Sequence, residues 1–465
     1  MAQNHPTPAS GGFPGVARGK KPSLRVAMVV FENRNYRFLW FSSLFSFTGM
    51  QMQQIARAVL AWELTESYGA VGLISLSFGL PMLCFSLIGG SLADRFEKRN
   101  LTFMSQASTG VFALTTAVML ITNTITIEWL FVLGLGGGTG MALGMPARSP
   151  LMAQVVGPEH VMSAMAMSNS AMNATRLFGP AVAGAMIGIW NIESVYLLQC
   201  SLYVVSCALL LFVPTGIGHV ALAYGAKRGN MFREIANGLN YVLHDSRLRQ
   251  LNISMLVVSF FAMPYVMLLA GFVKEDLGKG DTAFGLLQSF SGIGALVGSL
   301  GVATMTTYDR KPLLQMVAGV LGGFGLIALA FGSRSFGYSG AVGAILILGL
   351  ALTAYQTLNS TLLMDSARPE FYGRVMSINM LSFSAMPLMA FPLGQVADSI
   401  GVTNMFIAQG GIVVGCMALI AFFNPGHTFG RSLPVATMGL SADAPLAGEG
   451  APHLGNEEPV PAGGR

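Results

Sequence analysis

The chain has 465 residues, of which 53% are hydrophobic and only 10% are charged. Soluble chains carry about a quarter charged residues, so this composition argues against a series of soluble domains and indicates a polytopic, all-α membrane protein. The formal net charge of +5 comes from bases spread over short loops, which is not the pattern of a nucleic-acid-binding surface. The four cysteines all fall in apolar segments and predict neither a disulfide framework nor a metal site.

The two ends of the chain differ in composition from its middle. Residues 1–34 are rich in Pro, Gly and basic residues and show no signal-peptide pattern. Residues 425–465 are rich in Pro, Gly and Ala. We expect both ends to be disordered tails, because such segments bury too little apolar surface to fold.

A helix needs about 20 apolar residues to cross a bilayer, and twelve stretches qualify. The longest hydrophilic segment between them, residues 214–247, is predicted to be a central loop that divides them six and six. The predicted halves are thus residues 35–213 and 248–424. The predicted spans are 38–61, 69–93, 101–122, 127–147, 163–189, 193–213, 249–273, 283–305, 313–333, 339–363, 374–398 and 403–424.

The orientation of the spans follows from the Lys and Arg residues, which favour the cytoplasmic side. Only Lys274, Lys279 and Arg334 fall on the side opposite the N-terminus, and most of the 26 bases fall on the same side as it. Both termini and the central loop are therefore predicted to be cytoplasmic.

The two halves repeat each other in sequence. The segment Arg148–Asn169 aligns with Asn359–Met380 at an offset of 211, with identities that include Ser149/Ser360. Such a parallel repeat is typical of transporters built from two six-helix halves.

A short charged turn, Gly89–Arg99, joins the second and third predicted spans. Its Asp94 is expected to accept bonds from the N-terminal amides of a helix in the other half while it pairs with an Arg. A reduced copy, Asp309-Arg310-Lys311, follows the eighth span. The candidate gating residues of these regions and of the adjoining helix ends are Gly90, Asp94, Arg95, Lys98, Arg99, Arg148, Asp309, Arg310 and Asp365.

The spacing of Gly90, Asp94, Arg95, Lys98 and Arg99 resembles the loop between helices 2 and 3 of the major facilitator superfamily. Further stretches resemble its twelve-helix bacterial drug and siderophore exporters, which include enterobactin-exporter-like proteins. These stretches are Arg34–Trp40, Trp62–Ser67, Gly90–Arg95, Pro146–Arg148 and Asn173–Gly184. The resemblance implies a major facilitator fold in the bacterial inner membrane. It also implies alternating access, with the first, fourth, seventh and tenth helices around a central cavity.

Two departures and one match refine this resemblance. Glu97 stands where the family usually has Gly, and Met50 stands where many members carry Asp. The predicted spans hold no Asp, Glu or His at their middle, so coupling to protons stays open. Gly179-Pro180 with Gly184 is similar to the helix 5 motif associated with antiporters, and a plain packing kink would use the same residues.

Arg57 and Arg176 lie within the predicted spans, where an ionisable group is costly, and Arg148 lies at the inner end of the fourth span. Arg176, midway along the fifth span, is either a gate or anion partner, or a member of a structural pair. Arg148 either joins Asp94 in a charge relay or extends towards water. Arg57 lies near the outer end of the first span and is expected to extend towards water.

Neutral polar residues on the spans around the implied cavity are the candidates for substrate contact. Set among methionines and aromatic residues, they suit a large, mostly apolar substrate, although hydrogen bonds between helices would use the same residues. Glycines 136, 140 and 144 are expected to serve close helix packing. With Arg176, the cavity candidates are Gln51, Gln54, Ser259, Met263, Tyr265, Tyr355, Gln356 and Asn359.

The sequence contains no phosphate-binding loop, metal-ligand spacing or nucleophile elbow, so neither an enzyme nor a bound cofactor is predicted. The leading hypothesis is a secondary transporter that exports amphipathic small molecules, such as drug-like compounds or siderophores. The alternatives are an importer or facilitator of a small metabolite, and a membrane sensor or partner protein without transport activity. The expected partners are a small-molecule substrate and the lipid bilayer.

Overall fold

The computed structural model describes residues 28–216, 240–305, 308–367, 375–376, 378–379, 382 and 386–429. These residues are helical, with no strand among them. The predicted central loop and both predicted tails lie largely outside the described residues.

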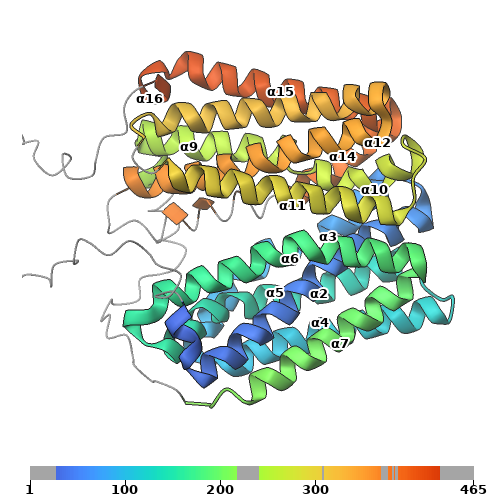
Figure 1. Ribbon diagram of the computed structural model, residues 1–465, viewed down its shortest axis with the longest axis vertical. Coiled ribbons are helices and arrows are strands. Elements are labelled where there is room, and N and C mark those ends of the chain that lie inside the picture. The colour runs from blue at the N-terminus through green and yellow to red at the C-terminus, as the bar shows by residue number, and fades with distance from the viewer. Residues whose placement is uncertain are drawn as a thin grey trace, which may run out of the picture.

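Figure 1 shows two helical bundles packed along their lengths. The first bundle, here the N-terminal half, follows a short 3-10 helix, Val29–Glu32. Its helices are α2 (Arg34–Thr65), α3 (Tyr68–Arg95), α4 (Lys98–Ile121), α5 (Ile127–Val156), α6 (Val161–Ile189) and α7 (Ile192–Leu211), with the 3-10 helix Pro158–His160 before α6.

The second bundle, here the C-terminal half, begins with α9 (Ser246–Val257). This helix continues through a π-helical turn, Val258–Ala262, into α10 (Tyr265–Glu275). The bundle is completed by α11 (Asp281–Thr304), α12 (Lys311–Ser366), α14 (Met386–Ile400), α15 (Val402–Phe423) and the short α16 (Pro425–Phe429).

Side-chain caps explain where many of these helices begin. A Ser, Thr, Asn or Asp before the first turn accepts a bond from an otherwise unpaired backbone amide. Ser67 accepts from the amide of Ala70 at 3.2 Å, and Asp245 accepts from that of Leu248 at 3.0 Å. The same device starts α2 at Asn33, α5 at Thr126 and α7 at Asn191.

The long helix α12 is a hairpin of two segments. Gly337 breaks it with φ 59° and ψ −136°, a conformation that residues with a side chain rarely adopt. Beyond this break the chain folds back on itself, since an added Cβ on Gly332 would lie 3.2 Å from the carbonyl oxygen of Gly340. The two segments match the spans predicted at 313–333 and 339–363.

Eight described helices are long and apolar enough to cross a membrane. The hairpin α12 counts as one of these eight helices. The stretch Ser246–Glu275, which contains α9 and α10, also counts as one. The polytopic helical class is therefore confirmed, while the count of twelve spans stays a prediction.

The same packing recurs in both halves. In the N-terminal half α3 lies against α5, where an added Cβ on Gly138 would be 2.5 Å from the carbonyl oxygen of Phe78. In the C-terminal half α11 lies against α12, where one on Gly298 would be 2.4 Å from that of Leu350. Such distances leave no room for a side chain, so the backbones touch. Glycines 136, 140 and 144 pack against α4, as expected.

The halves meet along two helix pairs, α3 with α14 and α6 with α11. Glycine lies at both contacts. An added Cβ on Gly72 would be 2.3 Å from the carbonyl oxygen of Ala390, and one on Gly184 would be 2.7 Å from the Cα of Gly285. The motif Gly179-Pro180 with Gly184 therefore lies where the two halves touch.

Candidate functional site

A carboxylate from one half caps a helix of the other. Asp398, near the end of α14, accepts hydrogen bonds from the Oγ of Ser67 at 2.8 Å, the amide of Tyr68 at 2.7 Å and the amide of Gly69 at 2.9 Å. These groups form the first turn of α3. A negative charge is stabilised there because unpaired amides and the helix dipole both favour it. We call the end of the molecule where α3 begins the Asp398 end.

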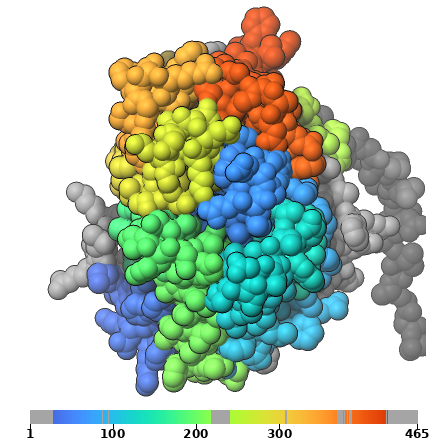
Figure 2. Space-filling view, turned by 90° about the vertical axis from the view of Figure 1, so that its right-hand side faces the viewer, coloured from blue at the N-terminus to red at the C-terminus, as the bar shows by residue number. Residues whose placement is uncertain are grey.

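Further contacts join the halves at the same end. Lys274 of α10 forms an ion pair with Glu63 of α2 at 2.9 Å and a second with Asp281 of α11, also at 2.9 Å. The hydroxyl of Tyr68 donates to Glu275 at 3.0 Å. Figure 2 looks onto this end, where the start of α3 (blue) lies directly against the C-terminal half (yellow and red). Polar contacts therefore close the Asp398 end.

In the sequence, Glu63 and Asp398 lie at or near the ends of predicted spans, and nothing there indicates that they join the halves. Asp398 lies 330 residues from Tyr68 in the chain, so local sequence carries no signal for this contact. The one available hint was the sequence Glu66-Ser67-Tyr68-Gly69, whose Ser67 marks a helix start.

The opposite end carries the charged turn Gly89–Arg99, and we call it the Arg95 end. Arg99 donates from Nε to the carbonyl of Leu210 at 3.1 Å and from Nη2 to that of Leu211 at 3.3 Å, so it caps the end of α7. Lys98 begins α4, and Arg95 is exposed at the end of α3.

Two further candidates lie in this turn. The side chain of Asp94 lies outside the described residues, so its cross-half cap stays a prediction. Glycines 89 and 90 at the start of the turn would allow a neighbouring helix to approach closely. Only Gly89 makes such an approach, beside the carbonyl of Ala142 in α5, while an added Cβ on Gly90 would meet open space.

The reduced copy of the turn lies at the start of α12. Lys311 pairs with Asp365, at the end of the same hairpin, with 3.0 Å between Nζ and Oδ2. Asp309 and Arg310 are exposed beside this pair. The pair ties the two segments of α12 together within the C-terminal half.

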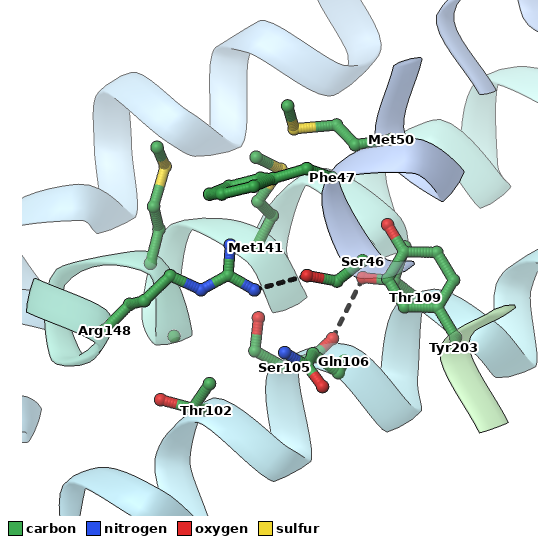
Figure 3. A pocket seen from close by; sticks show the side chains of 12 residues that line it. Ser46, Phe47, Met50, Thr102, Ser105, Gln106, Thr109, Met141, Arg148 and Tyr203 are labelled. Atoms are coloured by element: carbon green, nitrogen blue, oxygen red, sulfur yellow. Dashed lines mark hydrogen bonds between the residues drawn. The ribbon is translucent and has the colours of Figure 1, made fainter. Parts of the chain in front are cut away.

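Arg148 on α5 points into a pocket inside the N-terminal half (Figure 3). Its guanidinium donates to the Oγ of Ser46 and lies over the ring of Phe47, 4.4 Å from the centroid. The pocket lies between α2, α4, α5 and α7. It is lined by Ser46, Phe47, Met50, Thr102, Ser105, Gln106, Thr109, Met141, Gly144, Met145, Arg148 and Tyr203.

Arg57 also turns inwards, although its position near a helix end suggested that it extends towards water. Its guanidinium lies 4.3 Å from the centroid of the Phe78 ring. Its buried Nη1 atom has no hydrogen-bond partner among the described residues, and the same holds for the buried hydroxyl of Tyr196. Periodicity alone could not show this direction, because a side chain near a helix end can turn either way.

Arg176 is half-buried on α6, close to the contact between the halves. The nearest backbone of α11 is at Gly292, where an added Cβ would lie 3.1 Å from the carbonyl oxygen of Arg176. One turn further along α6, Gly179 lies against the side chain of Gln51 on α2. Gln51 and Gln54 are half-buried as well. Arg176 and Gln51 therefore lie near the boundary between the halves.

Most candidates in the C-terminal half are buried, and their side chains form hydrogen bonds with neighbouring helices. Tyr355 is 0% exposed and donates to Ser254 at 2.9 Å. Asn359 is 1% exposed and accepts from Gln315 at 2.7 Å. The same holds for Ser259, which donates to the carbonyl of Ser382, and for Tyr265, whose hydroxyl lies 3.2 Å from that of Ser291. The buried Met263 contacts Gln356, which is half-buried.

Two bundles of membrane-length helices, packed through small residues and joined by polar contacts at one end, are the architecture of major facilitator transporters. The fold matches a bacterial homologue of the human lysosomal transporter Spinster with a TM-score of 0.68 at 13% identity. That match covers 88% of this chain and 98% of the other. A peptide transporter POT matches with a TM-score of 0.68 at 14% identity, over 85% and 95% of the two chains.

The chain belongs to the MFS_3 family, described as transmembrane secretion effectors, whose model matches residues 26–429. It is therefore a transporter of the drug and siderophore branch of the superfamily, and not an enzyme.

Three similar proteins span most of the chain. The staphyloferrin A transporter of Staphylococcus aureus is 22% identical over 83% of this chain and 95% of its own. Macrolide efflux protein A of Streptococcus pyogenes is 23% identical over 79% and 90%. The multidrug efflux pump Tap of Mycobacterium tuberculosis is 23% identical over 85% and 94%.

Proposed function

We propose that this protein exports amphipathic small molecules, drug-like compounds or siderophores, by alternating access between its two halves. The observation that carries the proposal is the cross-half cap at Asp398. A carboxylate on α14 holds the start of α3, and the Lys274–Glu63 ion pair lies beside it. Contacts of this kind form and break as units when two rigid halves rock about a central site. The names of the similar efflux proteins support the direction.

The proposed membrane is the bacterial inner membrane, with both termini in the cytoplasm. The bias of Lys and Arg towards the N-terminal side supports this orientation, which turns the Asp398 end outwards. The state described here is then closed to the outside. The Spinster homologue of similar fold is described as inward-facing.

Substrate contact is proposed for the half-buried polar candidates Gln51, Gln54, Arg176 and Gln356. Their amide and guanidinium groups are available to a ligand. The buried candidates Tyr355 and Asn359 instead hold the C-terminal half together, because their polar groups already pair within it.

Import or facilitated diffusion is the second candidate. Among the described residues, the carboxylates of α2, α5, α7 and α14 lie near helix ends, at Glu63, Glu128, Glu193 and Asp398. A proton antiporter needs a carboxylate or another titratable group that changes its exposure during the cycle. If Asp94, Asp365 and Asp398 do not serve this role, the chain would facilitate diffusion along a gradient.

The test is accumulation of candidate compounds in cells that express the protein or lack it, with and without an uncoupler. Macrolides and catecholate siderophores are the first compounds. Lower accumulation that returns to the control level with the uncoupler is expected for an exporter. Higher accumulation would show import, and accumulation insensitive to expression across both classes would contradict the proposed function.

A further inference from the structure

The pocket around Arg148 has the donor set of an anion site. It encloses about 50 Å³, room for a few water molecules or one small ion. Arg148 contributes a guanidinium, of which one N–H is used by Ser46. Ser105, Gln106 and Tyr203, whose side chains carry hydroxyl or amide groups, also line the pocket. Among the twelve lining residues there is no Asp or Glu.

A guanidinium keeps its proton at any accessible pH, so its charge inside the bundle must be met by another group. The described contacts of Arg148 are one hydroxyl and the face of the Phe47 ring. A hydroxyl and a ring face carry only partial negative charge. A small anion in the pocket would balance the guanidinium with a full charge.

The position in the C-terminal half that is equivalent to Arg148 carries a neutral residue. The 211-residue repeat pairs Arg148 with Asn359. Asn359 accepts from Gln315 at 2.7 Å and donates to Asn379 at 3.1 Å, so its amide is paired on both sides. At this position the C-terminal half therefore has paired neutral side chains, whereas the N-terminal half has a pocket beside a cation.

Buried polar atoms without a partner among the described residues continue from the pocket towards the Asp398 end. Tyr203, a lining residue, lies against Gly49 of α2, as does Gln199 one turn along α7. Both amide atoms of Gln199 are buried without a partner among the described residues. So are the hydroxyl of Tyr196 and Nη1 of Arg57. Buried polar atoms normally have partners, so several adjacent unpaired ones indicate that a ligand or water completes them.

We propose that the Arg148 pocket binds a small anion, no larger than a carboxylate group. Arg148 holds the anion by its free N–H groups, and Tyr203, Gln106 and Ser105 add neutral donors. The site lies within the N-terminal half, so it is separate from the boundary at which the halves rock. It requires neither export nor any particular substrate, and a binding measurement on the purified protein tests it independently of the proposed function.

The experiment measures the thermal unfolding temperature of the purified full-length protein in nanodiscs. Sodium acetate, sodium chloride and the sodium salt of the bulky sulfonate MES are compared at equal ionic strength. A ligand that binds only the folded state raises this temperature with its concentration. We expect a saturable rise with acetate or chloride and none with MES. A rise with acetate alone assigns the site to the carboxylate of an organic molecule, and a rise with chloride assigns it to an inorganic ion.

Variants connect the rise to the pocket. Arg148→Gln should abolish it, and Tyr203→Phe or Ser105→Ala should raise the half-saturating concentration several-fold. Arg334→Gln, which removes an exposed guanidinium outside the pocket, should keep the wild-type curve. The proposal is overturned if the wild-type protein responds equally to all three salts or if Arg148→Gln keeps the rise. Should Arg148→Gln fail to fold, unchanged half-saturation in both Tyr203→Phe and Ser105→Ala overturns it as well.

Discussion

Removing the carboxylate of Asp398 should shift the protein towards a state that is open at the Asp398 end. Asp398 accepts three hydrogen bonds from the first turn of α3, at 2.7 to 2.9 Å. Loss of an N-cap costs about 0.5–2 kcal/mol. The three bonds argue for the upper part of that range, and the exposure of Asp398 to water argues for the lower part.

We take about 1.4 kcal/mol for Asp398→Ala, which is roughly tenfold in the equilibrium between the two states. Asp398→Asn keeps one acceptor oxygen but loses the charge, for which interaction with the helix dipole gives about 0.3–1 kcal/mol. Its shift should be roughly two- to fivefold. The population of the open state should therefore increase in the order wild type, Asp398→Asn, Asp398→Ala.

The assay is the reaction of a single cysteine placed behind this contact. Ser75 on α3 is 8% exposed and lies 2.9 Å from the sulfur of Met267 on α10, so it is covered by the other half. Ser75→Cys is small and is introduced after the four native cysteines are replaced. The rate of modification by a membrane-impermeant thiol reagent, added from outside to intact cells, then follows the population of the open state.

A matched control comes from the same end of the molecule. Asp276 accepts from Thr403 at 2.8 Å, and both residues belong to the C-terminal half. Asp276→Asn removes a similar charge without breaking a cross-half contact, so it should leave the rate at the wild-type level. Equal modification rates in Asp398→Ala, Asp276→Asn and the wild type would refute the assignment of Asp398 as a gate.

Three further outcomes are expected. Asp94→Asn should abolish most transport at normal membrane abundance, because breaking the predicted Asp94–Arg pair would cost on the order of 3–5 kcal/mol; wild-type turnover would contradict this. Gly184→Ala should lower transport strongly, because the added Cβ meets Gly285 at 2.7 Å, whereas Gly137→Ala meets open space and should not. Arg176→Gln should lower efflux of anionic compounds more than of cationic ones, with Arg176→Lys intermediate, in a paired efflux assay; equal effects would make Arg176 structural.

The membrane helices could be predicted from the sequence because their determinants are local. Apolar length predicts a span, and residues such as Ser67 and Asn191 mark where helices begin. Even the short turn at Gly337 falls between two predicted spans. Side-chain direction is different, because it depends on which helices pack around a residue. The turn of Arg57 over Phe78 shows this, since no pattern within α2 required it.

The contacts between the halves could not be predicted because they join residues that are distant in the chain. Asp398 and Glu63 each look like ordinary helix-end carboxylates in the sequence. Their partners, Tyr68 and Lys274, are fixed only when the halves come together. Pairing these residues from sequence would need a covariation signal, because water can solvate a carboxylate at a helix end equally well.

The two halves share a backbone plan but divide the chemistry between them. Both bury glycine contacts between neighbouring helices, so each can move as a rigid unit. The N-terminal half holds Arg57, Arg148 and Arg176 within its helices, whereas the C-terminal half has the neutral Asn359 where the repeat places Arg148. The C-terminal half supplies Asp398, which caps a helix of the N-terminal half. The proposed charge recognition thus belongs to the first half, and the proposed gate takes its carboxylate from the second, so a ligand bound among the arginines would influence transport only through contacts between the halves.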